Sequence, residues 1–384
     1  MGDRLRMAKG ERFPAEWKTF RDGETGALVR QLTDYKGHSH HLYFTNSGWY
    51  DGGTRLLFGS DRDNRTNLFS LNMEDGTILQ LTDLPPGEDV SFLSASVNPV
   101  RPECYYWAGR VLWALDLRTL EERPLYERPE GFRGSITSVT ADGRYVCTSI
   151  WQEVLPTELD RGYVGFRETW EARPLSKVLR VPVDGGKAEV LHEERYWIGH
   201  VNTSPKKPEL LTFCHEGPWT LVDQRIWGLD LRTGRVWPIR PTGPGERVGH
   251  EFWLSDGERV GYHGSTPEGP IFGAARWDGR EVSEFPIPPG STHLHCRDLD
   301  LVVGDGSSED PYLLLWRFRG GEAEGPRRLV RHRGSFHVQQ LHVHPRFTED
   351  GGGVIYTSDH TGYGNLYLVE VPEFEELPEH MEAL

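Results

Sequence analysis

The sequence predicts an all-β fold, a seven-bladed β-propeller, and three observations support this prediction. Hydrophobic residues make up 36% of the chain while aromatic residues reach 11%, so the chain is polar overall but rich in large rings. Glycine (44) and proline (26) supply many turn formers. A strand-and-turn pattern also recurs along the whole chain, and repeats of about 40 to 50 residues are typical of propeller blades.

The repeated unit is an apolar strand, a polar turn, a second strand that ends in an Asp/Gly turn, and a strand of alternating character. Its clearest copy runs from Thr54 to Asp83. In Leu68–Met73, residues of different character alternate with the period of two expected of a strand with two unlike faces. Seven copies begin near Thr54, Glu103, Arg144, Glu209, Arg259, Leu299 and Gly352.

The two ends of the chain are predicted to close the ring. The last copy ends near Val371 and lacks an outer strand, whereas residues 16–34 read as a strand pair around a DGETG turn. We therefore expect this N-terminal pair to complete the seventh blade, within a single domain that spans residues 1–384. The longest insertion, Val154 to Leu175, is a candidate helix.

Charge and cysteine content restrict the function classes. A net charge of −15 argues against non-specific binding to nucleic acid or to anionic membranes, and an anionic ligand would need a local cation. The four cysteines are far apart and form no CxxC pair, which argues against a disulfide framework or a structural zinc site. The chain shows no secretory h-region and no long apolar run, so we expect a soluble, cytoplasmic protein.

Histidine pairs are the strongest functional signal. In VQQLHVHPRF, His342 and His344 would point to one side of an extended strand, and Gln339 could fold back to offer its carbonyl oxygen. Two imidazoles and an amide oxygen suit manganese, nickel, cobalt or zinc. In THLHCRD, His293 or His295 could supply a third imidazole. The alternative for each pair is an exposed or solvated pair of polar residues.

Further candidates lie in the middle of the chain. FCHEGPWTLVDQRIW carries His215 and Arg225, and GHEFW carries His250, followed by Trp253, which could stack on a sugar ring or pack in the core. HSHHLYF, with histidines within residues 38–41, is expected to be a solvated loop. The chain has no GxSxG elbow, no Walker A loop and no GxGxxG after a strand, which argues against a prolyl-peptidase or nucleotide-binding reading.

Together, the motifs FCHEGP, DQRIW, HEFW, PPGSTHLH, VGDG and QQLHVHP resemble those of the oligogalacturonate lyases. Members of that family are intracellular seven-bladed propellers that degrade pectin fragments. The resemblance runs from RDGETGALVRQLT near the N-terminus to YTSDHTGYGNLYLVEVPE near the end. The segment HSHHLYFTNSGWYDGG departs from the family pattern.

The resemblance implies a manganese-type divalent metal held by three histidines and a glutamine. By motif, these ligands are His293, Gln339, His342 and His344. His293 is preferred over His295 because it follows the PPGST segment, and Gln339 is preferred over Gln340 because of its spacing to His342.

The resemblance also assigns the catalytic base to His250 and places Arg225 at the catalytic centre, where it would also bind substrate. We expect His215 and Trp253 to be further substrate contacts. The predicted activity is metal-dependent β-elimination of short oligogalacturonides to 4,5-unsaturated uronates. Two alternatives stay open: a non-catalytic TolB-like propeller that binds a protein partner, which predicts no convergence of the four ligands, and a lyase acting on another uronate oligosaccharide.

Overall fold

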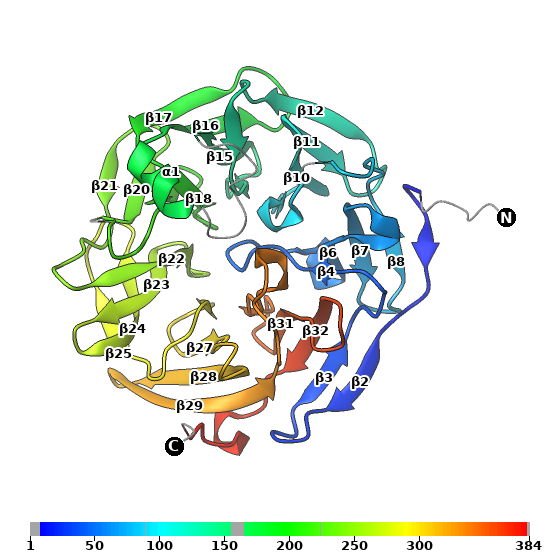
Figure 1. Ribbon diagram of the computed structural model, residues 1–384, viewed down its shortest axis with the longest axis vertical. Coiled ribbons are helices and arrows are strands. Elements are labelled where there is room, and N and C mark those ends of the chain that lie inside the picture. Colours follow the sequence, from blue (N-terminus) through cyan, green and yellow to red (C-terminus); the bar gives the residue numbers. More distant parts are fainter. Residues whose placement is uncertain (1–7, 89, 155–164, 223, 382–384) are drawn as a thin grey trace.

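The computed structural model describes residues 8–88, 90–154, 165–222 and 224–381. Within these ranges the strands form seven antiparallel sheets arranged as blades around a central axis (Figure 1). The predicted fold class, an all-β seven-bladed propeller, is confirmed. No helix of the described residues is long and apolar enough to cross a membrane.

The blades are numbered along the chain, and the strand nearest the axis is called the inner strand. Blade 1 contains β1 (Arg12–Phe13), β4 (Ser39–His40), β5 (Trp49–Tyr50), β6 (Arg55–Ser60), β7 (Asn67–Asn72) and β8 (Ile78–Gln80). Blade 2 contains β9 (Ser96–Val97), β10 (Glu103–Ala108), β11 (Val111–Asp116) and β12 (Glu122–Glu127). Blade 3 contains β13 (Phe132–Gly134), β14 (Ser138–Val139), β15 (Tyr145–Gln152), β16 (Leu175–Pro182) and β17 (Glu189–Arg195).

Blades 4 to 6 have four strands each. Blade 4 contains β18 (Ile198–Thr203), β19 (Leu210–His215), β20 (Ile226–Asp230) and β21 (Val236–Pro238). Blade 5 contains β22 (Arg247–Trp253), β23 (Arg259–Thr266), β24 (Gly269–Arg276) and β25 (Ser283–Pro286). Blade 6 contains β26 (Leu294–Cys296), β27 (Leu301–Gly304), β28 (Tyr312–Arg319) and β29 (Glu322–Arg331).

Blade 7 is built from both ends of the chain. It contains β30 (Arg346–Phe347), β31 (Gly353–Ser358) and β32 (Asn365–Glu370), followed by the N-terminal β3 (Leu28–Gln31) and β2 (Lys18–Arg21). β3 pairs with β32, with Val29 opposite Val369. The strand pair expected within residues 16–34 therefore occupies the outer positions of this blade.

Every predicted repeat begins at or just before the second strand of a blade and not at the inner strand. The reason is that several inner strands, such as β9 and β30, have only two residues and carry no readable periodicity. The predicted Asp turns are present: in LDLRT, Asp116 Oδ1 accepts the N–H groups of Arg118 and Thr119, each at 2.8 Å. Such a turn joins outer strands without strain.

Few helices interrupt the strands. The insertion Val154 to Leu175 contains α1 (Phe166–Ala172), while its residues 155–164 lie outside the described residues. The other helices of the described residues are single 3-10 turns: η1 (Asp51–Gly53), η2 (Arg62–Asn64), η3 (Phe92–Ser94), η5 (Gln339–Leu341) and η6 (Phe374–Glu376).

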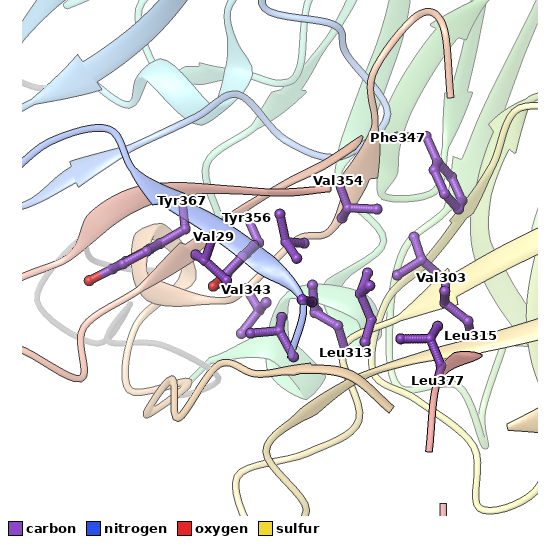
Figure 2. Packing of buried hydrophobic residues seen from close by; sticks show 14 of the residues in the cluster. Val29, Val303, Leu313, Leu315, Val343, Phe347, Val354, Tyr356, Tyr367 and Leu377 are labelled. Atoms are coloured by element: carbon purple, nitrogen blue, oxygen red, sulfur yellow. The ribbon is translucent and has the colours of Figure 1, made fainter. Parts of the chain in front are cut away.

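The hydrophobic core lies between neighbouring blades. In Figure 2, Val303 and Leu315 of blade 6 pack beside Val354 of blade 7, and Val29 from the N-terminal strand joins the same cluster. Because each blade is covered on both faces, strand β7 is buried along nearly its whole length, and its alternation does not mark a solvent face. Packing between neighbouring blades holds each sheet in place, and with it the inner strands that carry the site.

Candidate metal and catalytic site

Three histidines from blades 6 and 7 converge near the axis. One nitrogen from each of His293, His342 and His344 lies within 4.8 Å of the others. The ring centroids of His293 and His344 are 4.4 Å apart, and those of His342 and His344 are 5.5 Å apart. All three side chains are buried. The structure thus brings together three of the four residues predicted as metal ligands.

The backbone that presents His342 and His344 differs from the prediction. These residues do not lie on an extended strand but in the loop between η5 and β30. His342 is extended (φ −64°, ψ 148°), whereas His344 has a left-handed φ of 47°. A left-handed residue is uncommon outside glycine and turns the chain sharply. The rings of His342 and His344 thus come together at a sharp turn of the backbone, and not through the alternation of an extended strand.

Asp305 orients the third ring. Asp305 Oδ2 lies 2.7 Å from His293 Nδ1, and its Oδ1 accepts the backbone N–H groups of Thr292 and His293. Burial raises the pKa of Asp305, but the charge and hydrogen bonds of His293 outweigh this, so the pKa is lowered. An ionised Asp305 holds the proton on Nδ1 and leaves the Nε2 lone pair for a metal, the usual carboxylate–histidine arrangement.

The donor set fits a first-row divalent cation. His342 Nδ1 and His344 Nε2 are buried and lack a hydrogen-bond partner among the described residues. Burial lowers the pKa of His342 to about 4 and that of His344 well below its usual value, so both rings are neutral, the form that binds metals. Unpartnered buried nitrogens are costly unless an ion or another ligand uses them.

The fourth predicted ligand, Gln339, is the first residue of η5 and its side chain is exposed. The adjacent Gln340 is half-buried. Gln339 thus precedes His342 by one 3-10 turn, which places it close to His342 and His344 along the chain. Its coordination of a metal stays a prediction.

His295 lies apart from this cluster. Its ring stacks on Phe252 at 5.3 Å, and its nitrogens face Arg346 Nη1 at 3.1 Å and the Phe347 N–H at 3.3 Å. Of the two histidines in THLHCRD, it is therefore His293 that joins His342 and His344.

His250 stacks directly on His293. The two ring centroids are 4.8 Å apart at an interplanar angle of 16°. His250 has a left-handed φ of 50° at a β-bulge in β22, which re-aims its side chain. Its Nδ1 lies 2.9 Å from the Thr292 carbonyl oxygen and 3.0 Å from His263 Nε2. Burial lowers the pKa of His250 well below its usual value, so its Nε2 is a free, neutral base.

Arg225 brings a positive charge next to His250. Its Nη1 donates to Glu216 Oε1 at 2.7 Å, and its Nε lies 3.9 Å from Glu251 Oε2. The ring of Trp219 lies 5.4 Å from the guanidinium and 5.0 Å from the His250 ring. The two residues predicted to be catalytic therefore line one site around a shared indole.

A glycine makes this approach possible. A Cβ on Gly249 would lie 2.6 Å from Arg225 Nε and 2.9 Å from the Trp219 ring. The dipeptide Gly-His recurs one blade earlier as Gly199–His200, again at a bulge and with a left-handed φ of 45° at His200. His200 faces Glu216 at 3.5 Å and His250 at 6.2 Å between ring centroids.

A second group of potential ligands, His200, Cys214 and Glu216, also has donor atoms within 4.8 Å. Arg225 already places its charge 2.7 Å from Glu216. Burial raises the pKa of the Cys214 thiol well above its usual value. The nearby guanidinium and the protonated thiol both oppose the binding of a cation. We therefore interpret this group as the surroundings that hold Arg225 in place.

Of the three predicted substrate contacts, Arg225 lies in the site, whereas the side chains of His215 and Trp253 lie away from it. His215 stacks on Tyr196 at 3.8 Å and pairs with Glu194 at 2.8 Å, because strand alternation sends it away from the side that Glu216 faces. Trp253 follows His250 by three residues, roughly 10 Å along a strand. Its Nε1 donates to the Asn202 carbonyl oxygen at 2.9 Å, and its ring lines a cavity shared with His295.

The segment expected to be a solvated loop instead fills the middle of the ring. His40 and His41 are buried at 5% and 3% exposure. The connection from β4 to β5, blue in Figure 1, reaches the axis beside the segment that precedes β30. Tyr43 packs 4.9 Å from His344, and Phe44 packs 5.5 Å from His293. This aromatic pair is the floor of the histidine site.

Sequence reasoning assigned no role to several of these residues. Asp305 was visible in the VGDG motif, since it follows a strand that pairs with the one after His293. His200 was visible as the repeated Gly-His dipeptide. Glu251, Trp219 and His263 carried no separate signal.

The fold and site define a seven-bladed propeller with a buried histidine centre suited to a divalent metal. A family model described as oligogalacturonate lyase matches residues 7–375, so the chain belongs to the oligogalacturonate lyase family. The predictions of the family and of an enzyme of this class are confirmed. The alternative of a non-catalytic, TolB-like propeller is not supported, since it predicted no convergence of the histidines.

Curated relatives and solved structures agree with this assignment. The oligogalacturonide lyase of Pectobacterium atrosepticum is 29% identical over 96% of this chain and 99% of its own length. The oligogalacturonate lyase of Dickeya dadantii is 28% identical with the same coverage. The crystal structure of a Vibrio parahaemolyticus oligogalacturonate lyase has a TM-score of 0.86 at 29% identity, covering 95% of this chain and 99% of that one. An oligogalacturonate lyase in complex with manganese has the same TM-score and identity, covering 96% and 99%.

Proposed function

We propose that this protein cleaves short oligogalacturonides by metal-dependent β-elimination and releases products with a 4,5-unsaturated uronate. The observation that carries the proposal is the stacking of neutral His250 on His293, which places a base against three convergent imidazoles. The manganese complex of a relative with the same fold supports manganese as the metal.

The chemistry requires removal of the uronate C5 proton. This proton lies α to the C6 carboxylate, whose negative charge opposes formation of a carbanion beside it. A divalent cation held by His293, His342 and His344, with the predicted Gln339, would supply the Lewis acid that offsets this charge. The Arg225 guanidinium is a second positive charge for the same carboxylate.

His250 is prepared to act as the base. With its Nδ1 proton directed to the Thr292 carbonyl oxygen, the Nε2 lone pair is available, and burial keeps the ring neutral near pH 7. As Nε2 takes the C5 proton, the electron pair of the C5–H bond stays with C5 and is delocalised onto the C6 carboxylate. That pair forms the C4–C5 double bond as the C4–O bond breaks, and the glycosidic oxygen leaves with the electron pair of the C4–O bond and takes up a proton from solvent.

The direct test is the ultraviolet absorbance of the conjugated alkene after digalacturonate or trigalacturonate is added with manganese. His250→Ala should lower the rate about 10²-fold to 10⁴-fold, the usual contribution of a general base, while bound metal stays unchanged. His192→Ala, which removes a half-buried histidine of β17, is the matched control and should keep full activity. Loss of metal in His250→Ala would make this residue a ligand, and no absorbance rise between roughly pH 6 and pH 9 would reject the activity.

The chain length and type of the substrate can be tested on the same assay. A net charge of −15 repels long polygalacturonate, whereas a local metal and arginine can hold a short fragment. We expect higher kcat/KM on di- and trisaccharides than on the polymer. Faster cleavage of other uronate oligosaccharides in a substrate panel would reassign the substrate.

A further inference from the structure

A large cavity lies at the other end of the inner strands. It has a volume of about 870 Å³ and is lined by residues from all seven blades. The lining comes from the last residues of inner strands and from those just after them, as with Trp253 of β22, Arg297 after β26 and Thr348 after β30. The histidine site uses residues near the starts of the same strands. The inner strands of blades 4 to 7 therefore link the two sites.

The charge of the cavity is opposite to that of the protein. Its lining includes five basic residues, Arg101, Arg118, Lys206, Arg297 and Arg346, against two acidic ones, Asp51 and Glu349. The difference is a formal charge of +3 (5 − 2), in a chain whose net charge is −15.

Two of these cations are available to a ligand. Arg101 is paired with Asp184, and Arg118 lies 3.8 Å from Asp51. Within the described ranges, no ion pair joins Lys206 or Arg297 to a carboxylate, although the charge of Arg297 contributes to lowering the pKa of Asp350. The net positive charge of the cavity therefore attracts an anion, although the protein as a whole is negatively charged.

Buried polar atoms in the cavity wall are also unpartnered. Asn202 is 4% exposed; its Nδ2 donates to the carbonyl oxygens of His200 and Glu251, and its Oδ1 has no partner among the described residues. Thr45 Oγ1 and Arg346 Nε are also buried and have no hydrogen-bond partner among the described residues. Buried polar atoms normally have a hydrogen-bond partner, so these unpartnered atoms favour a polar ligand in the cavity.

An aromatic surface accompanies the polar groups. The Trp253 indole is half-buried and held by its hydrogen bond to the Asn202 carbonyl oxygen. A fixed indole beside amides and guanidinium groups is suited to a sugar ring that carries a carboxylate. Neither a purely apolar ligand nor a bare inorganic anion would use all of these features.

We infer that this cavity is a second binding site, for a short acidic saccharide, separated from the histidine site by Tyr43 and Phe44. The choice of an acidic sugar as the occupant deepens the proposed function and rests on it. The two can nevertheless be separated, because the cavity is tested by binding and the lyase is tested by alkene formation.

The probe is digalacturonate, titrated calorimetrically into the His342→Ala/His344→Ala variant and, in parallel, into the wild-type chain with a metal chelator. Both forms should bind one molecule per chain. Adding Lys206→Ala and Arg297→Ala should weaken binding at least tenfold. Adding Arg232→Ala and Arg280→Ala, which remove two exposed arginines elsewhere, should leave binding unchanged.

Three results would overturn the inference: no binding by either metal-free form, binding that persists after Lys206→Ala/Arg297→Ala, or equal binding of neutral galactobiose or of sulfate. In a chain with the histidines intact, Lys206→Ala/Arg297→Ala should retain lyase turnover on saturating trigalacturonate. Complete loss of turnover would make the cavity part of the catalytic site and would also overturn the inference. Normal binding without any alkene product would reject the proposed lyase alone.

Discussion

Near their starts, the inner strands of blades 4 to 7 gather neutral imidazoles, whereas near their ends they gather guanidinium, ammonium and amide groups. The two groups differ in how burial acts on them. On the histidine side burial keeps the rings of His250, His342 and His344 neutral, which suits a base and metal ligands. On the cavity side burial lowers the pKa of Arg346, but a guanidinium group stays charged near neutral pH, which suits an anion.

The difference shows how a propeller can carry two unlike sites on one set of strands. Two residues at the start of β26 are enough to move from one site to the other, since His293, just before this strand, joins the metal cluster while His295 packs against Phe252 and Arg346. The aromatic pair Tyr43 and Phe44 packs against His344 and His293, and the next residues along the chain, Thr45 and Asn46, line the cavity.

The comparison of His293 with His295 predicts the largest effect. His293→Ala should lower manganese affinity by about a hundredfold or more, because one of three converging imidazoles is lost, and alkene formation should fall with it. His295→Ala should keep the metal, although removing a buried ring lowers stability. Metal content by atomic spectroscopy, with circular dichroism as the folding control, separates the two. Equal metal loss in both variants would contradict the assignment.

The second largest effect is expected from a comparison of two arginines, Arg225 in the histidine site and Arg297 in the cavity. Arg225 is held by Glu216 on one side and faces Glu251 on the other, while Arg297 forms no ion pair with any of the residues that the structure describes. Arg225→Lys keeps the charge but loses the planar set of donors, so kcat/KM should fall by about tenfold to a hundredfold. Arg297→Lys should leave kcat/KM within about twofold, by the same principle. A full rate in Arg225→Lys would mean that only its charge matters.

Asp305→Asn should have a smaller and recoverable effect. Asparagine keeps the Oδ1 acceptor for the Thr292 and His293 N–H groups, but its amide would donate to His293 Nδ1 and force the proton onto Nε2. Manganese affinity should fall about tenfold to a hundredfold, and excess manganese should restore turnover. Asp310→Asn, which alters a partly exposed carboxylate paired with His380, is the control. An unchanged affinity in Asp305→Asn would show that His293 does not need its partner.

Much of the fold could be predicted because periodicity survives in long strands. The second strands, such as β6 and β10, were readable, whereas the two-residue inner strands were not. For the site, motif resemblance selected His250, His293 and Arg225, which the structure brings close together, while their roles stay predictions. It could not show the left-handed backbone at His344, which depends on packing of a loop.

The side chains of His215 and Trp253 lie away from the histidine cluster for two different reasons. Alternation along a strand decides which of two neighbours reaches the site, so the Glu216 carboxylate faces Arg225 and the His215 ring does not. Trp253 was assigned to the site of His250, but an inner strand crosses the channel and carries its last residue to the far side. Three residues of spacing in the sequence do not show that His250 and Trp253 lie at opposite ends of the channel, because this depends on where the strand lies in the fold.

Acid should destabilise the histidine side, and this is the smallest of the expected effects for any single group. Burial lowers the pKa of His40 to about 4 and those of His41 and His263 to about 3. These rings are neutral when folded but take up a proton near pH 6.5 when unfolded, so their stability is complete above that pH and is lost as the pH falls toward 4. By pH 5, each contributes a loss of about 2 kcal/mol relative to pH 7.

Glu251 opposes this trend. Burial raises its pKa to about 7, so its contribution is present at low pH and is lost as the pH rises from about 4.5 to 7. Urea unfolding of the chelated protein should therefore show lower stability at pH 5 than at pH 7, and Glu251→Gln should widen the gap by about 2 kcal/mol. Arg297→Ala, on the cavity side, should leave the gap unchanged. Equal stability at the two pH values would mean that the buried histidines are not held neutral, and the contrast between the two sides would fail.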